Sequence, residues 1–174
     1  ESASDIPIAV AALGEQTLEE LRVDVFTDYL VQLPGVTAGG AGPGNNTIYI
    51  RGLASTTPAT SIAGVAGLAP NVAFYLDEQP LSQPGRNLDV YAADLERVEV
   101  LSGPQGTLFG RNTSTGALNI TNVRPDLEEA GGFLNATYGN YDHMSLQGAV
   151  NIPLAEGKVA ARLTGAVRKR DGFV

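Results

Sequence analysis

The stretch RVEVLSGPQGTLFGRNTSTGALNI, residues 97–120, decides the fold of this 174-residue chain. A short strand is predicted over residues 95–101, which begins two positions before this stretch. Arg97 and Glu99 share one face of this strand, because side chains two positions apart point the same way. Charged groups are costly to bury alone, so each of the two needs a polar or oppositely charged partner if it is shielded.

Glycines characterise the rest of the stretch. The strand ends at the breaker Ser102-Gly103-Pro104, and the second apolar run, Ala117–Ile120, predicts another strand. The loop between them contains Gly106, Gly110 and Gly116. So many glycines predict a backbone that bends sharply or that another surface approaches closely.

This stretch resembles the signature of the plug domain of TonB-dependent outer-membrane receptors. The signature positions of that resemblance are Gly103, Pro104, Gly106, Gly110, Gly116 and Asn119. Three further segments continue it. Residues 5–10 resemble the first plug strand, residues 48–52 (IYIRG) resemble the family's Ile-Arg-Gly element, and residues 72–77 resemble its central hairpin.

The resemblance implies an α+β fold, with a small mixed-sheet plug domain and two short helices over residues 1–126. Residues 127–174 would then be the first antiparallel strands, about three, of an outer-membrane β-barrel that is incomplete here. Thr17 and Glu20 have the spacing of a capping box and predict the first helix there. The second helix is predicted from Asp24 to the breaker Pro34-Gly35. Its apolar residues recur at helical spacing and are Phe26, Tyr29, Leu30 and Leu33.

The tip of the hairpin departs from the family pattern. Family members usually carry Asp-Gly there, whereas Asp77 is followed by Glu78 in this chain. A two-residue type I′ turn needs positive φ at both central positions, which glycine tolerates far better than glutamate. Glu78 therefore predicts a longer or bulged turn.

Residues 131–170 alternate between apolar and polar side chains in three runs. This period of two is typical of membrane-barrel strands with one face on lipid and one on a wet lumen. A strand of about 10 residues, tilted by about 45°, spans about 23 Å, which matches the apolar band of such barrels. An antiparallel sheet on a soluble core gives the same alternation, so that alternative stays open. Open sheet edges do not persist in hydrocarbon, so these strands need the remainder of a barrel as partner.

Composition excludes several functions. The net charge of −8 argues against nucleic acid as partner, and basic side chains gather in residues 158–174. The chain has no cysteine, and His143 is its only histidine, so nitrogen- and sulfur-rich metal sites are excluded. No G-x-S-x-G elbow is present, and we expect neither a cofactor nor enzymatic activity. The sequence contains no apolar run long enough for a transmembrane helix and no signal segment, and we interpret it as a mature or excised piece.

Two loops of small residues, 38–46 and 54–71, have two possible roles. The first is glycine-rich, but a strand follows it where a phosphate-binding loop would open a helix. By resemblance, both loops could lie at the substrate-facing apex of the plug. They could equally be ordinary surface loops.

The resemblance also implies a function, namely energy-coupled uptake of a scarce solute through a barrel that the plug gates. Candidate solutes are a ferric siderophore-like chelate, cobalamin or a glycan. The implied location is the outer membrane of a Gram-negative bacterium, with the plug facing the periplasm. The implied partners are outer-membrane lipid, an unknown small-molecule substrate and a TonB-type coupling protein, whose binding box is expected upstream of residue 1. The alternative is a free periplasmic plug-like binding module that does not transport.

Certain residues are candidates for the contact between plug and barrel. They are Arg51, Gly52, Arg97 and Glu99. The resemblance implies that Arg51 pairs with acidic residues of the barrel wall, and we expect its guanidinium to be partly shielded. For Arg97 and Glu99, a pair internal to the plug is the alternative to an interface role. On the barrel strands, we expect Arg162, Arg168 and Arg170 to face the lumen.

Overall fold

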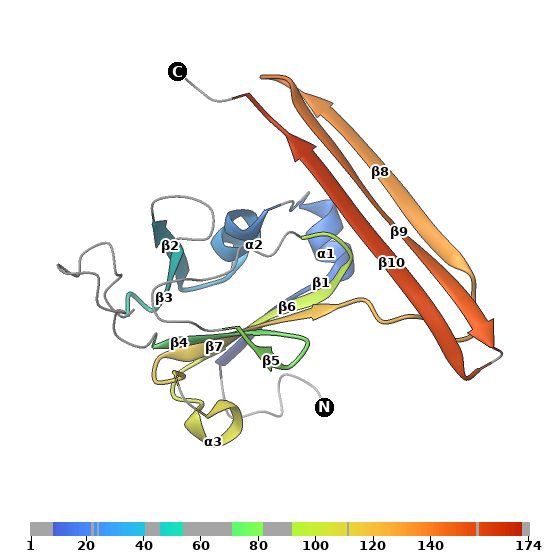
Figure 1. Ribbon diagram of the computed structural model, residues 1–174. Helices are drawn as coiled ribbons and strands as arrows, with labels where there is room; N and C mark the ends of the chain where they lie inside the picture. Colours follow the sequence, from blue (N-terminus) through green and yellow to red (C-terminus); the bar gives the residue numbers. More distant parts are fainter. Residues whose placement is uncertain are drawn as a thin grey trace, which may run out of the picture. The chain divides into compact units, whose positions relative to one another are not determined.

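A computed structural model describes residues 9–21, 23, 25–40, 46–53, 71–81, 92–110, 112–155 and 157–171. They belong to two compact units, Glu1–Asn122 and Val123–Val174. Figure 1 labels the helices and strands of both units, and each unit is described by itself.

The first unit is built on a mixed five-stranded sheet in the order β1-β6-β7-β4-β5. Its strands are β1 (Ala9–Gly14), β6 (Leu95–Ser102), β7 (Gly116–Asn122), β4 (Val72–Leu76) and β5 (Gln79–Pro80). The pair β4–β7 is parallel, and the other pairs are antiparallel. The predicted mixed sheet is thereby confirmed.

Helices α1 (Glu15–Glu20) and α2 (Phe26–Gln32) supply part of the core of this unit. The hairpin of β2 (Val36–Gly40) and β3 (Asn46–Ile50) supplies another part. The predicted apolar face of α2 is buried as expected, and the Phe26 ring meets those of Tyr29 and Phe74 edge-on at 5.4 and 5.8 Å. Tyr29 and Phe74 are fully buried, so these rings fill the centre of the core.

The predicted helix starts need correction. Helix α1 begins at Glu15 after Gly14 and has no side-chain cap, so Thr17 lies inside the helix and the predicted capping box is wrong. Helix α2 begins at Phe26 rather than at Asp24, because the Asp28 carboxylate accepts a hydrogen bond from the Val25 amide at 3.0 Å. The predicted first strand, residues 5–10, lies mostly outside the described residues, and β1 begins at Ala9.

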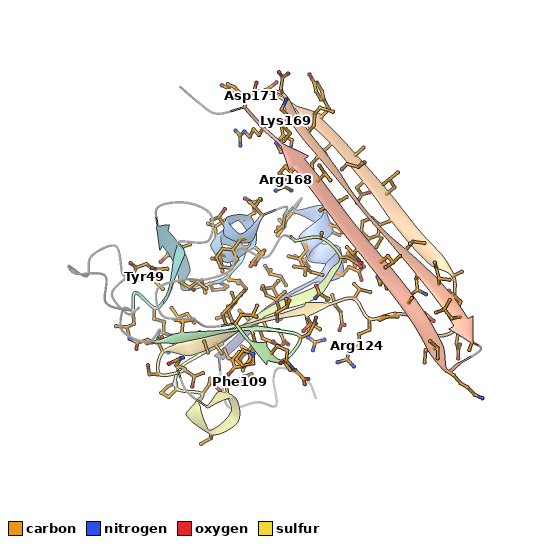
Figure 2. The ribbon with its side chains drawn as sticks, in the orientation of Figure 1. Tyr49, Phe109, Arg124, Arg168, Lys169 and Asp171 are labelled. Atoms are coloured by element: carbon orange, nitrogen blue, oxygen red, sulfur yellow. The ribbon has the colours of Figure 1, made fainter. Side chains whose placement is uncertain are left out.

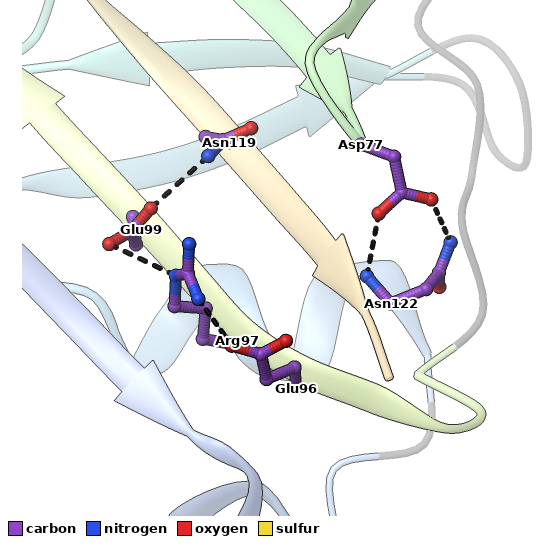
Figure 3. Close-up of polar contacts among 6 residues, drawn as sticks. All are labelled: Asp77, Glu96, Arg97, Glu99, Asn119 and Asn122. Atoms are coloured by element: carbon purple, nitrogen blue, oxygen red, sulfur yellow. Dashed lines mark hydrogen bonds and ion pairs between the residues drawn. The ribbon is translucent and has the colours of Figure 1, made fainter. Parts of the chain in front are cut away.

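The hairpin tip is a two-residue turn, so the prediction of a longer or bulged turn is wrong. Leu76 pairs with Gln79, and Asp77 and Glu78 have φ values of 48° and 67°. The Asp77 carboxylate stabilises this turn by accepting hydrogen bonds from the backbone amide and the side-chain Nδ2 of Asn122, at 2.9 and 2.7 Å (Figure 3). A contact 45 positions away in sequence therefore permits the conformation that Glu78 disfavours locally.

The second unit is a three-stranded antiparallel sheet in the order β10-β9-β8. Its strands are β8 (Gly131–Gly139), β9 (His143–Ala155) and β10 (Val159–Lys169). They contain the three alternating runs of the sequence, and apolar side chains of all three strands are exposed. Among the helices of the described residues, none is long and apolar enough to cross a membrane.

We predict that Asp77→Ala destabilises the first unit by about 1–2 kcal/mol, because it removes the two hydrogen bonds to Asn122. The matched control is Glu78→Ala, which places the same side chain at the neighbouring positive-φ position without removing those bonds. Denaturant unfolding of both variants measures the difference. Equal losses of stability in the two variants would show that the Asp77 contacts contribute nothing.

Candidate functional site

The predicted pair Arg97 and Glu99 lies on the sheet face opposite the main core. Val98 and Val100 of the same strand point into that core and are almost fully buried. The Arg97 Nε lies 3.3 Å from the Glu99 Oε1, and the Arg97 guanidinium also contacts Glu96 (Figure 3). The pair internal to the plug, one of the two predicted alternatives, is therefore present.

Asn119 of β7 extends this polar group across the sheet. It is the register partner of Glu99, and its Nδ2 donates a hydrogen bond to Glu99 Oε2 at 3.1 Å. This bond fixes the orientation of the amide, because an ionised carboxylate only accepts hydrogen bonds. The Asn119 Oδ1 is buried and has no hydrogen-bond partner among the described residues.

The polar group of Glu96, Arg97, Glu99 and Asn119 is better suited to binding a partner surface than to stabilising the fold. Side chains of Arg97 and Glu99 are 42% and 26% exposed. Ion pairs this accessible to water contribute only about 0–1 kcal/mol to folding. Two carboxylates and one guanidinium held in fixed positions can still orient a charged or polar partner surface.

Arg51 and Gly52 form a tight turn at the end of β3. Their φ values are 53° and 76°, and the backbones of Ile50 and Leu53 exchange hydrogen bonds across them at 3.2 and 3.0 Å. The Arg51 amide also donates to the Gly35 carbonyl at 2.8 Å. Arg51 is exposed within the described residues, at the point where the chain reverses, and the shielding of its guanidinium by a barrel wall stays a prediction.

The glycine signature builds a closed loop between β6 and β7. Backbone bonds from Gly103 to Thr115 and from Gln105 to Thr113 close its base, both at 3.0 Å. Helix α3 (Gly106–Phe109), which we did not predict, lies in this loop and ends at Gly110 with a φ of 69°. Gly116 has no room for a side chain, since an added Cβ would lie 2.4 Å from the Leu101 carbonyl oxygen.

Helix α3 covers a small apolar patch beside the polar group. The rings of Phe109 and Tyr75 lie 5.1 Å apart, and the Tyr75 hydroxyl donates to the Phe109 carbonyl. Ala73 and Ala117 complete the patch. The signature glycines Gly106 and Gly110 therefore bound a short helix that holds Phe109 over Tyr75.

The predicted arginines of the strands occupy two different places. Arg162 and Arg168 of β10 lie on the polar face and are half-buried. Arg170 follows the end of β10, and its guanidinium lies 6.0 Å from the centre of the Tyr141 ring. Figure 2 shows Arg168 and Lys169 at this end of β10.

Of the two loops of small residues, most positions, 41–45 and 54–70, lie outside the described residues. Residues 38–40 belong to β2 and Asn46 belongs to β3. Across the described ranges, no group of three or more His, Asp or Glu side chains could hold a metal ion. His143 is half-buried at the start of β9.

Comparisons with known proteins give a consistent result. The catecholate siderophore receptor Fiu of Escherichia coli K12 is 30% identical over 127 residues, which are 70% of this chain and 14% of Fiu. The vitamin B12 transporter BtuB of Vibrio vulnificus is 28% identical over 82% of this chain and 22% of BtuB. The chain thus spans less than a quarter of the length of these two relatives.

Solved structures share the fold. The ferric yersiniabactin uptake receptor FyuA from Yersinia pestis matches with a TM-score of 0.77 and 25% identity, over 94% of this chain and 24% of FyuA. The pyoverdine outer membrane receptor FpvA from Pseudomonas aeruginosa matches with a TM-score of 0.78 and 22% identity, over 97% and 23%. The family model of the TonB-dependent receptor plug domain matches residues 2–117. This chain belongs to the TonB-dependent receptor plug domain family.

Proposed function

We propose that this chain is the N-terminal part of a TonB-dependent outer-membrane transporter. Its plug would gate the lumen of a barrel for energy-coupled uptake of a scarce solute. The observation that carries this proposal is the exposed apolar face of the three strands that directly follow the plug.

The apolar face is continuous across the three strands. The register places Tyr138, Met144 and Lys169 side by side across the three strands. Two residues further along each strand, it does the same for Ala136, Leu146 and Val167. The exposed apolar side chains of this face are Leu134, Tyr138, Met144, Leu146, Val150, Ile152, Leu154, Val159, Leu163 and Val167. A soluble sheet would bury such a face, whereas contact with lipid acyl chains satisfies it.

The length of this face fits a membrane. Met144 and Leu154 mark its ends on β9, and ten residue steps at about 3.4 Å, tilted by about 45°, cross about 24 Å. The apolar band of outer-membrane barrels is about 25 Å tall. Tyr138 and Lys169 at one end have the chemistry that prefers the boundary between acyl chains and headgroups.

The opposite face is polar and suits a wet lumen. It carries Ser145, Gln147 and Asn151 of β9 and Arg162 and Arg168 of β10. Within the described residues, β8 and β10 each pair with β9 only, so each has one open edge. An open edge is not tolerated in hydrocarbon, and the remainder of the barrel would supply the missing strands.

The polar surfaces of the plug support a gate that can move. Arg51 and the Arg97–Glu99 pair, which are accessible to water, offer charged and polar contacts to a barrel wall. Contacts of this kind are specific, and water can replace them without exposing a large apolar surface. They would hold the plug against leakage and still yield when a TonB-type coupling protein pulls on the chain.

The class of solute follows from the relatives and not from the described residues. Fiu is named for catecholate siderophores and BtuB for vitamin B12, so we propose a scarce, bulky chelate of this kind. An enzymatic role has no support in the family or in the side chains of the site. A free periplasmic module is disfavoured, because the apolar face of the strands would then lie in water.

We predict that the complete gene restores growth of a receptor-deficient strain on at least one ferric chelate or on cobalamin. The matched strain lacks the TonB-type coupling protein and should show no rescue. Uptake of the radiolabelled solute is measured in the strain with the coupling protein and in the strain without it. Rescue that persists without the coupling protein, or no uptake of any chelate, cobalamin or oligosaccharide, would contradict the proposal.

We also predict that Arg51→Ala loosens the plug in the complete receptor, because it removes an exposed cation that a rigid turn holds in place. Entry of a large antibiotic should rise several-fold in cells that express this variant. Lys158→Ala, which removes an exposed cation from the turn between β9 and β10, is the control and should leave exclusion unchanged. Unchanged exclusion by Arg51→Ala would count against a contact with the barrel.

A further inference from the structure

Asn151 of β9 uses both ends of its side-chain amide in hydrogen bonds. It is only 3% exposed. Its Nδ2 donates to the carbonyl oxygens of Asp126 and Glu129 at 2.9 and 2.6 Å, and its Oδ1 accepts from the Asp126 amide at 2.9 Å. Both donor hydrogens and the acceptor are therefore used to hold the segment that precedes β8.

The segment that Asn151 holds is itself a compact turn. The Asp126 Oδ1 accepts hydrogen bonds from the amides of Glu128 and Glu129, at 2.7 and 3.1 Å. These two bonds lower the pKa of the Asp126 carboxyl from its ordinary value, because they favour its ionised form. Residues 126–129 are otherwise exposed, so their position depends on these bonds and not on packing.

A second contact fixes the other side of the connection between the units. Asp77 binds the backbone amide and side chain of Asn122, the last residue of β7 (Figure 3). Only Val123, Arg124 and Pro125 lie between this contact and the Asn151 contact. Pro125 restricts Arg124 to extended conformations, which stiffens this short segment.

The length of this connection sets a limit on movement. Four residue steps from Asn122 to Asp126 can span at most about 14 Å. Without the Asn151 contact, the connection would run from Asn122 to Gly131, the first residue of β8, and could span about 32 Å over nine steps.

We propose that Asn151 is the anchoring residue that keeps the connection between plug and strands short. Through it, the C-terminal end of the plug can be displaced only slightly while the plug opens. This role in gating rests on the proposed function, whereas the anchor itself does not.

The test is amide hydrogen exchange on the complete receptor in a membrane, compared between wild type and Asn151→Leu. We expect exchange of the Asp126 amide, which donates to Asn151 Oδ1, to become at least tenfold faster in the variant, while β9 and β10 keep their protection. The control is Asn135→Leu, the same change at an exposed asparagine on the polar face of β8, and should alter nothing at residues 126–130. Unchanged exchange there, or loosening throughout β9 and β10, would overturn the anchor.

A second variant protects the test against misfolding. Asp126→Ala leaves β9 intact but removes the two bonds within the turn, so the amides of Glu128 and Glu129 should exchange at least tenfold faster. Because Asn151 binds only backbone groups of this segment, the amide at position 126 should keep its protection in this variant, and its loss would overturn the anchor. Neither exchange experiment requires uptake, so a receptor that transports nothing but exchanges as expected would refute the proposed function and leave the anchor standing.

The role in gating has its own measurement. Cells with Asn151→Leu should admit a large antibiotic several-fold faster than cells with Asn135→Leu, because the longer connection frees the end of the plug. Equal exclusion by the two variants, with the exchange difference present, would overturn the gating role of the anchor.

Discussion

The exposed apolar face of β8, β9 and β10 is the constraint on which the functional account depends. Water does not satisfy such a face, and within the described residues no other element is paired to the outer edges of β8 and β10. Hydrocarbon satisfies the face but makes the open edges more costly, since each unpaired backbone group there costs several kcal/mol. The apolar face is covered and the open edges are paired only when further strands close the sheet around a polar interior.

The plug is suited to such an interior because its sheet has two different faces. One face carries the aromatic and aliphatic core under the helices, while the other carries Arg97, Glu99 and Asn119 beside a small patch covered by α3. A plug that was apolar all round would leave the polar groups of a wet lumen without partners and would tend to aggregate in water. Polar groups that already have partners within the plug can exchange them for partners on a wall at little cost.

Sequence periodicity predicted what depends on local repetition. The helix face from Phe26 to Leu33 and the two-faced strands of residues 131–170 were found from spacing alone. What depends on distant contacts was missed. Asn122 decides the turn at Asp77 and Glu78, and the Asp28 side chain sets the start of α2. Asn151 looks like any other polar residue of an alternating strand, and only the folded segment before β8 distinguishes it.

The proposed function requires that one face of the strands contacts lipid and the other contacts water. Single spin labels at Leu163 and Thr164, neighbours on opposite faces of β10 in the complete receptor, distinguish the two environments. The label at position 163 should collide readily with molecular oxygen, which dissolves in acyl chains, and the label at 164 with a water-soluble nickel complex. If both labels instead met the nickel complex equally well, residues 131–169 would not lie in a membrane, and the account would be contradicted.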